Sequence, residues 1–201
     1  MPVTALIIYL VWLALAFGVR SWVQWRRTGD AGFRGAALDR GTVQWWARLL
    51  FVAALVAGVA GPIAALAGLP PLPGADHWLP QAAGTGLALF GVAATLAAQA
   101  SMGASWRVGV AEEETTDLVT TGAFAFARNP IFTAMIVTAA GLAVMVPNLV
   151  SLAALLLAVV AIELQVRAVE EPYLRRVHGS AYLRWAARVG RFLPGLGRLS
   201  H

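Results

Sequence analysis

The sequence predicts an all-α, polytopic membrane protein with five transmembrane helices and a C-terminal amphipathic cytoplasmic tail. Of its 201 residues, 59% are hydrophobic and only 12% are charged, whereas about a quarter of the residues in a soluble domain are charged. Several apolar runs approach the roughly 20 residues that span a bilayer core. The basic residues lie in alternate connections between these runs, which indicates a regular membrane topology.

The apolar runs define the expected helices, which cover residues 4–23, 45–68, 81–101, 130–146 and 149–168. Gly61-Pro62 predicts a kink in the second helix, which neighbouring helices must compensate. The many Ala and Gly residues of the third helix favour close packing. Pro130 is favoured in the first turn of the fourth helix. The first run lacks a basic segment before it and a small-residue cleavage pattern after it, so we interpret it as a retained helix.

All fifteen basic residues are arginines, and two of the four connections between helices contain none. By the positive-inside rule, this pattern places the N-terminus outside and the C-terminus in the cytoplasm. Arginines next to a membrane interact with anionic headgroups, so the pattern favours membrane lipids over nucleic acid as partners. The arginines lie in or next to the segments after the first helix (Arg20, Arg26, Arg27, Arg34, Arg40, Arg48), the third (Arg107, Arg128) and the fifth (Arg167, Arg175, Arg176, Arg184, Arg188, Arg191, Arg198).

The chain divides into two expected parts. Residues 1–100 would form the first three transmembrane helices, and residues 101–201 would form a loop, the helical hairpin 130–168 and the tail. The lack of cysteine excludes disulfides and thiol catalysis, and three scattered histidines do not favour a metal site. The acidic run Glu112-Glu113-Glu114 is interpreted as a solvated loop face.

Polar residues are expected to meet where the hairpin 130–168 opens toward the cytoplasm. The tight turn at Pro147-Asn148 makes its helices antiparallel neighbours, which would bring Asn129 close to Glu170 and Glu171. The acidic pair could balance charge in the arginine-rich tail, or accept hydrogen bonds from a vicinal diol such as a ribose. Glu163 and Arg167, four residues apart, would form either a helix-end ion pair or part of a cavity wall.

Several motifs in the second half of the chain, taken together, resemble those of a known protein family. Gly122 and an aromatic turn precede Arg128-Asn129-Pro130-Ile131-Phe132, and Glu170-Glu171 follows the hairpin. Tyr182 and the run Arg191-Phe192-Leu193-Pro194 come later in the tail. In order and spacing, this set resembles the superfamily of isoprenylcysteine carboxyl methyltransferases and phospholipid N-methyltransferases. The resemblance does not extend to residues 1–100 beyond their being membrane helices.

The resemblance implies a membrane enzyme that binds S-adenosylmethionine at the cytoplasmic surface and receives a lipophilic acceptor from the bilayer. Glu170 or Glu171 would hold the ribose or the amino acid end, and Tyr182 would close the tail over the cofactor. Arg128 or Arg191 could orient an acceptor carboxylate by a bidentate contact, or anchor lipid headgroups. The cofactor-binding residues implied are Gly122, Phe124, Asn129, Pro130, Phe132, Glu170, Glu171 and Tyr182.

Two positions depart from the family pattern. Asn129 replaces a histidine and cannot titrate near neutral pH, so it cannot act as a general base. Phe132 replaces a tyrosine but keeps a ring that can pack on adenine or face a sulfonium. Both favour direct methyl displacement, which needs alignment more than proton transfer, with a carboxylate as one possible acceptor.

Two other functions stay open at this point. A helical membrane reductase that uses NADPH could have a similar C-terminal arrangement, although it would be expected to offer more basic contacts to phosphate. A non-catalytic membrane scaffold is the other alternative, because Asn129 and Phe132 depart from the catalytic pattern.

Overall fold

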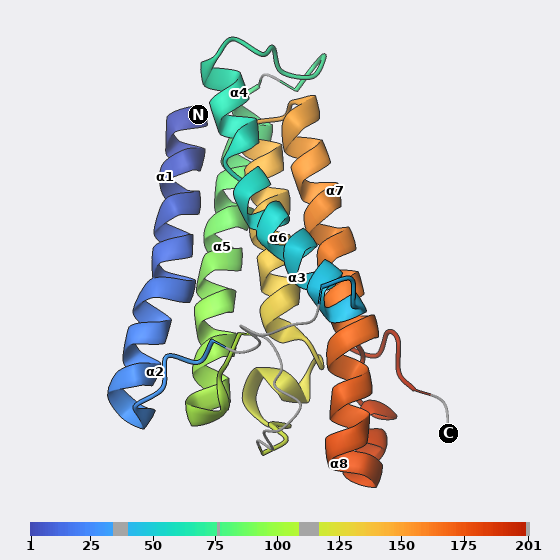
Figure 1. Cartoon of the computed structure of the whole chain (residues 1–201). Helices are drawn as coiled ribbons and strands as arrows, with labels where there is room; N and C mark the ends of the chain where they lie inside the picture. The colour runs from blue at the N-terminus through green and yellow to red at the C-terminus, as the bar shows by residue number, and fades with distance from the viewer. Residues whose placement is uncertain (34–39, 76, 109–116, 200–201) are drawn as a thin grey trace.

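The protein is an elongated helical bundle, seen in a computed structural model that describes residues 1–33, 40–75, 77–108 and 117–199 (Figure 1). These residues form no β-strand beyond two isolated bridges, which confirms the all-α class. Two predictions fall outside the described residues: the position of Arg34 after the first helix, and the solvated loop face at Glu112–Glu114. The α-helices are α1 (Pro2–Leu13), α2 (Arg20–Thr28), α3 (Val43–Ala57), α4 (Ala60–Leu66), α5 (Trp78–Met102), α6 (Pro130–Met145), α7 (Leu149–Leu164) and α8 (Glu171–Ala186). Shorter π- or 3-10-helical elements are η1 (Ala14–Val19), η2 (Gly103–Ser105), η3 (Gly122–Ala125) and η4 (Gln165–Glu170).

Among the described residues, four helical segments are long and apolar enough to cross a membrane: Pro2–Thr28, Val43–Leu66, Trp78–Met102 and Leu149–Ala186. The helix Pro130–Met145 is apolar as well but has only 16 residues. The structure therefore supports a membrane protein with four candidate spans and one shorter apolar helix, where the sequence had predicted five spans.

The last helix differs most from the prediction. It was expected to end near residue 168 and continue as a polar tail, but it runs through η4 and α8 to Ala186. The tail is rich in Leu, Arg and Ala, which have high helix propensity even where hydropathy falls. The helix changes direction at Gly179, whose φ of 49° favours glycine. Only residues 187–199, called the C-terminal loop below, are irregular.

The predicted kink in the second helix is present but lies earlier in the chain. The break between α3 and α4 falls at Gly58 and Val59 rather than at Gly61-Pro62. Proline lacks an N–H donor, and its ring crowds the carbonyl four residues before it. Pro62 therefore disturbs the helix at Gly58, one turn upstream.

Helices α5 and α6 pack closely through small residues. A Cβ added to Gly91 would lie 2.5 Å from the backbone nitrogen of Thr138, and one on Gly141 would lie 2.3 Å from that of Ala88. Backbones approach this closely only where side chains are absent or small. The glycine-rich third helix thus packs tightly, as predicted, and it fixes the position of α6.

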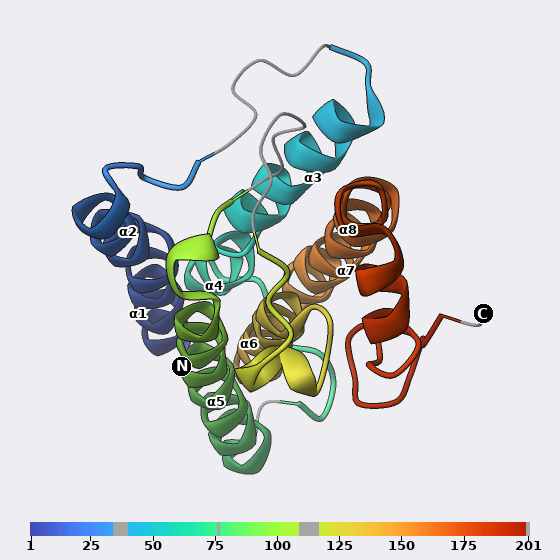
Figure 2. The same cartoon turned by 90° about the horizontal axis from the view of Figure 1, so that it is seen from below.

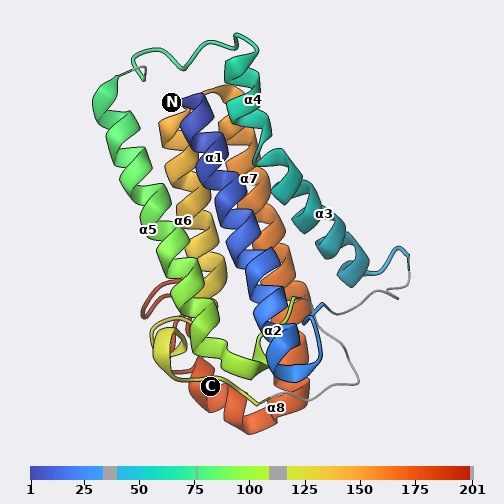
Figure 3. The same cartoon turned by 90° about the vertical axis from the view of Figure 1, so that its left-hand side faces the viewer.

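The arginine-rich connections of the described chain gather at one end of the bundle. The end of α2, the beginning of α3, the beginning of α6 and α8 all lie at the lower end in Figure 1. The N-terminus and the turn between α6 and α7 lie at the upper end. Two further views show that the lower part of α3 leans away from α2 (Figures 2 and 3).

Candidate functional site

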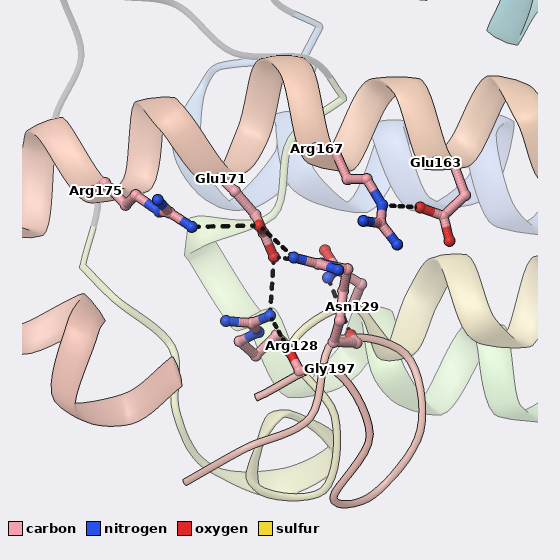
Figure 4. A network of polar contacts seen from close by, with 8 residues as sticks. Arg128, Asn129, Glu163, Arg167, Glu171, Arg175 and Gly197 are labelled. Carbon is pink, nitrogen blue, oxygen red and sulfur yellow. Dashed lines mark hydrogen bonds and ion pairs between the residues drawn. The ribbon is translucent and has the colours of Figure 1, made fainter. Parts of the chain in front are cut away.

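A buried carboxylate organises the lower end of the bundle (Figure 4). The Glu171 side chain is only 6% exposed. It accepts hydrogen bonds from Arg191 Nε at 2.8 Å and from Arg191 Nη2 at 3.0 Å. Arg128 Nη2 lies 3.0 Å from Glu171 Oε1, and Arg175 Nη2 lies 3.9 Å from Oε2. We call these four residues the Glu171 cluster; bidentate contacts of this kind are among the stronger hydrogen bonds in proteins.

Basic groups outnumber acidic groups in the Glu171 cluster, because three arginines surround one carboxylate. Burial lowers the pKa of Arg128, whereas the hydrogen bond to Glu171 raises the pKa of Arg191. Both guanidinium groups remain protonated, as arginine does in proteins. Arg128 Nε and Nη1 are buried without a hydrogen-bond partner in the described structure. Arg128 can therefore still bind a further acceptor group.

The Asn129-Pro130 corner and the preceding Arg128 are hydrogen-bonded to the C-terminal loop. The backbone nitrogen of Arg128 donates to Gly190 O at 2.8 Å, and its Nη2 donates to Gly197 O at 2.9 Å. Asn129 donates to Arg191 O from both its backbone nitrogen and Nδ2, each at 3.0 Å. The expected meeting of the Asn-Pro corner with the acidic pair is thus present, and the C-terminal loop completes it.

A cavity of about 520 Å³ lies next to this corner. Its walls come from the lower halves of α3 and α5, the beginning of α6, η1, η4 and α8. This volume lies in the range of small-molecule sites. Several predicted site residues line it, namely Phe124, Arg128, Asn129, Pro130, Phe132 and Glu170. The predicted Gly122, Glu171, Tyr182 and Arg191 are not part of the lining.

The adjacent carboxylates Glu170 and Glu171 have separate environments. Glu171 belongs to its cluster, whereas Glu170 lines the cavity and accepts a hydrogen bond from Gln165 Nε2 at 3.2 Å. Gln165 and Glu170 are the two ends of the π-helical element η4, and the wide π turn with its i→i+5 pattern brings such residues together. Sequence reasoning named both carboxylates but could not assign them, because it had no signal for the π turn.

A second π-helical element also borders the cavity. Ala16 and Phe17 of η1 are lining residues, and Ala16 O accepts a hydrogen bond from Gln99 Nε2 at 2.9 Å. Gln99 and Thr95 line the cavity from α5 and are buried. Neither residue was predicted from the sequence, although a glutamine in a membrane helix is a signal of function. Such π bulges occur frequently at functional sites.

The predicted residues outside the cavity support its walls. Tyr182 is 1% exposed and packs edge-on against Trp185, with ring centroids 5.8 Å apart, in a cluster with Phe124. Gly122 has a φ of 60°, and a Cβ there would lie 2.8 Å from Ser101 Oγ. Tyr182 is therefore a packing residue behind the cavity, and Gly122 is required by the turn.

Glu163 and Arg167 form an ion pair one turn apart on the same helix. Both side chains are more than a third exposed, and the pair lies along the helix from the Glu171 cluster (Figure 4). Of the two interpretations from the sequence, the ion pair is confirmed. It lies within a helix that continues to Ala186 and not at a helix end.

Comparison with known proteins gives one family. A model of the phospholipid methyltransferase family matches residues 79–181, just over half of the chain, whereas no curated protein matches it. The matched segment runs from α5 into α8 and includes the six cavity residues named above together with Glu171. The chain therefore belongs to the phospholipid methyltransferase family, within the superfamily of isoprenylcysteine carboxyl and phospholipid membrane methyltransferases that its C-terminal motifs resemble.

Proposed function

We propose that this protein is an integral membrane methyltransferase that uses S-adenosylmethionine to methylate a lipophilic acceptor. The observation that carries the proposal is the cavity between the Asn129-Pro130 corner and Glu170. Both the corner and Glu170 lie in the segment matched by the family. The family supports methyl transfer in a membrane protein. It supports neither of the alternatives, the nicotinamide-dependent reductase or the scaffold.

The cavity residues fit the proposed cofactor. The Glu170 carboxylate can accept hydrogen bonds from a ribose diol or an ammonium group. The rings of Phe124 and Phe132 can pack on adenine or face a sulfonium. Arg128 Nη1 and Trp185 Nε1 are buried on lining residues without a partner in the described structure. Buried donors of this kind need an explanation, and a bound ligand would provide one.

In the proposed reaction, the bound cofactor supplies a methyl group on a positively charged sulfur. Glu170 anchors the methyl donor. The Phe132 ring packs edge-on against Phe51, with ring centroids 5.9 Å apart, and forms an apolar wall that excludes water. Asn129 donates to a backbone carbonyl and holds no proton that it could exchange near neutral pH. The acceptor must therefore arrive as a competent nucleophile, such as a carboxylate or a neutral amine, aligned for displacement.

Arg128 and Arg191 take different parts in this proposal. Arg128 lines the cavity with Nε and Nη1 unpartnered in the described structure, so it can orient an acceptor carboxylate. Arg191 donates from Nε and Nη2 to Glu171 and acts as a positioning residue for the corner. The acceptor's tail would contact apolar residues of α3 and α6 in the cavity wall, namely Phe51, Val52, Leu55 and Met135.

Calorimetry of the detergent-purified protein tests the proposal. We expect S-adenosylhomocysteine to bind and NADPH not to bind. Glu170→Gln should weaken S-adenosylhomocysteine binding about tenfold or more, because it removes a carboxylate oxygen that can accept a hydrogen bond from the ligand. Glu163→Gln, an exposed carboxylate on the same helix, is the matched control and should leave affinity unchanged. Binding of NADPH instead would identify a reductase, and binding of neither would support a scaffold.

A further inference from the structure

The C-terminal loop exposes large apolar side chains that no contact in the described chain covers fully. Leu193 is 50% exposed and Leu196 is 64% exposed. Phe126 is 69% exposed and lies beside the loop, because Ala127 pairs with Gly190. The loop follows the last candidate span, which ends at Ala186, so burial in the hydrocarbon core does not account for these residues. Apolar groups clustered in this way mark an interaction surface.

The charge around the loop selects the kind of partner. Residues 172–201 contain six arginines and no aspartate or glutamate. Arg184, Arg188 and Arg198 are exposed. A segment that combines exposed Leu and Phe with arginines suits the interface of a membrane with anionic headgroups. The loop lies at the edge of the bundle beside α8, near its lower end (Figures 1 and 2).

The same loop holds the cavity rim in place. Besides its bonds to Arg128 and Asn129, it accepts a hydrogen bond from Thr133 Oγ1 to Phe192 O at 2.8 Å. Within the loop, Arg191 donates its backbone N–H to Leu196 O at 2.7 Å, so the position of Leu196 is linked to that of Arg191. A ligand that orders the apolar tip of the loop would therefore also order the loop carbonyls that accept hydrogen bonds from Arg128 and Asn129.

We propose that the C-terminal loop is a membrane-docking element for anionic lipid, and that its docking strengthens cofactor binding in the cavity. Leu193, Leu196 and Phe126 enter the interface of the adjacent leaflet, and the exposed arginines bind lipid phosphate. The coupling to cofactor rests on the proposed function, whereas the docking itself does not. The two parts are linked thermodynamically, because a ligand that stabilises one ordered state favours every other ligand of that state.

Site-directed spin labelling tests the docking. The chain has no cysteine, so Leu196→Cys and Leu193→Cys each give one labelled site, with exposed Ser180→Cys on α8 as the control. In bilayers that contain phosphatidylglycerol, we expect labels at 193 and 196 to be more accessible to oxygen than to a water-soluble nickel complex. The label at 180 should favour the nickel complex. Loop labels as accessible to nickel as the control would overturn the docking.

Calorimetry in lipid nanodiscs tests the coupling. S-adenosylhomocysteine should bind about fivefold or more tightly in nanodiscs with phosphatidylglycerol than in neutral nanodiscs. Leu196→Ser should reduce this difference, and Leu79→Ser, an exposed leucine near the opposite end, should retain it. Equal affinity in both lipids would overturn the coupling. A lack of binding in either lipid would contradict the proposed function instead, while the spin labels would still decide the docking.

Discussion

Glu170 and Glu171 are neighbours in the chain, but their replacement should have different consequences. Glu171→Gln leaves the buried Arg128 and Arg191 without their carboxylate. Removing one partner of a buried ion pair costs about 3–5 kcal/mol, so the melting temperature in detergent should fall sharply. Glu170→Gln should lower the melting temperature much less, because Glu170 hydrogen-bonds to the neutral Gln165 and forms no ion pair with another described residue. Equal losses from both variants would contradict this division.

Asn129 shows which property of the family histidine this protein retains. Its Nδ2 donates to Arg191 O, and a histidine ring nitrogen can donate in the same way. We therefore expect Asn129→His to keep stability and S-adenosylhomocysteine affinity. Asn129→Asp places an acceptor against that carbonyl and should cost about 1–3 kcal/mol, measured by thermal unfolding. An aspartate variant as stable as the histidine variant would show that the donor is not needed.

The sequence allowed the corner and the acidic pair to be predicted because both carry a recognisable motif. It did not show which carboxylate faces the cavity, since Glu170 and Glu171 are the same residue type at adjacent positions. Gln99 was missed because its role depends on Ala16, a residue 83 positions away. Contacts over such separations follow from packing, which one sequence does not display.

The packing of α5 on α6 gives a prediction about these two helices. Gly91→Leu should destabilise the bundle, because its Cβ alone would lie 2.5 Å from Thr138 N. Overpacking costs about 1–3 kcal/mol or more. Gly86→Leu on the same helix is the matched control, since a Cβ there meets nothing within 4 Å. A melting temperature lowered by the second variant as much as by the first would contradict the packing argument.

The sequence predicted which segments are helical better than it predicted where the helices end and where their turns are irregular. The apolar runs identified the helical segments, and Pro130 marked the beginning of α6 correctly. Hydropathy placed the end of the last helix too early, because a polar amphipathic helix and a polar tail have similar composition. The π-helical element η1 gave no signal, since one extra residue in a turn leaves its all-apolar pattern unchanged.

The topology of the bundle can be tested on the intact protein. The positive-inside rule predicts that the end carrying α8 faces the cytoplasm. In sealed inverted vesicles, a membrane-impermeant maleimide should label Ser180→Cys and not Pro71→Cys, both of which are exposed positions. Intact spheroplasts should give the opposite pattern. Labelling of both positions from one side would contradict the arrangement in Figure 1, where α8 and the connection between α4 and α5 lie at opposite ends of the bundle.

The short helix α6 has a consequence for how the proposed acceptor would reach the cavity. Its 16 residues rise about 24 Å, several ångströms less than a hydrocarbon layer of about 30 Å. Such a mismatch is relieved by local thinning of the bilayer or by sinking the helix end below the headgroups. Either adjustment brings the Asn129 rim toward the level of acyl chains. A lipid could then present its reactive group without being extracted into water.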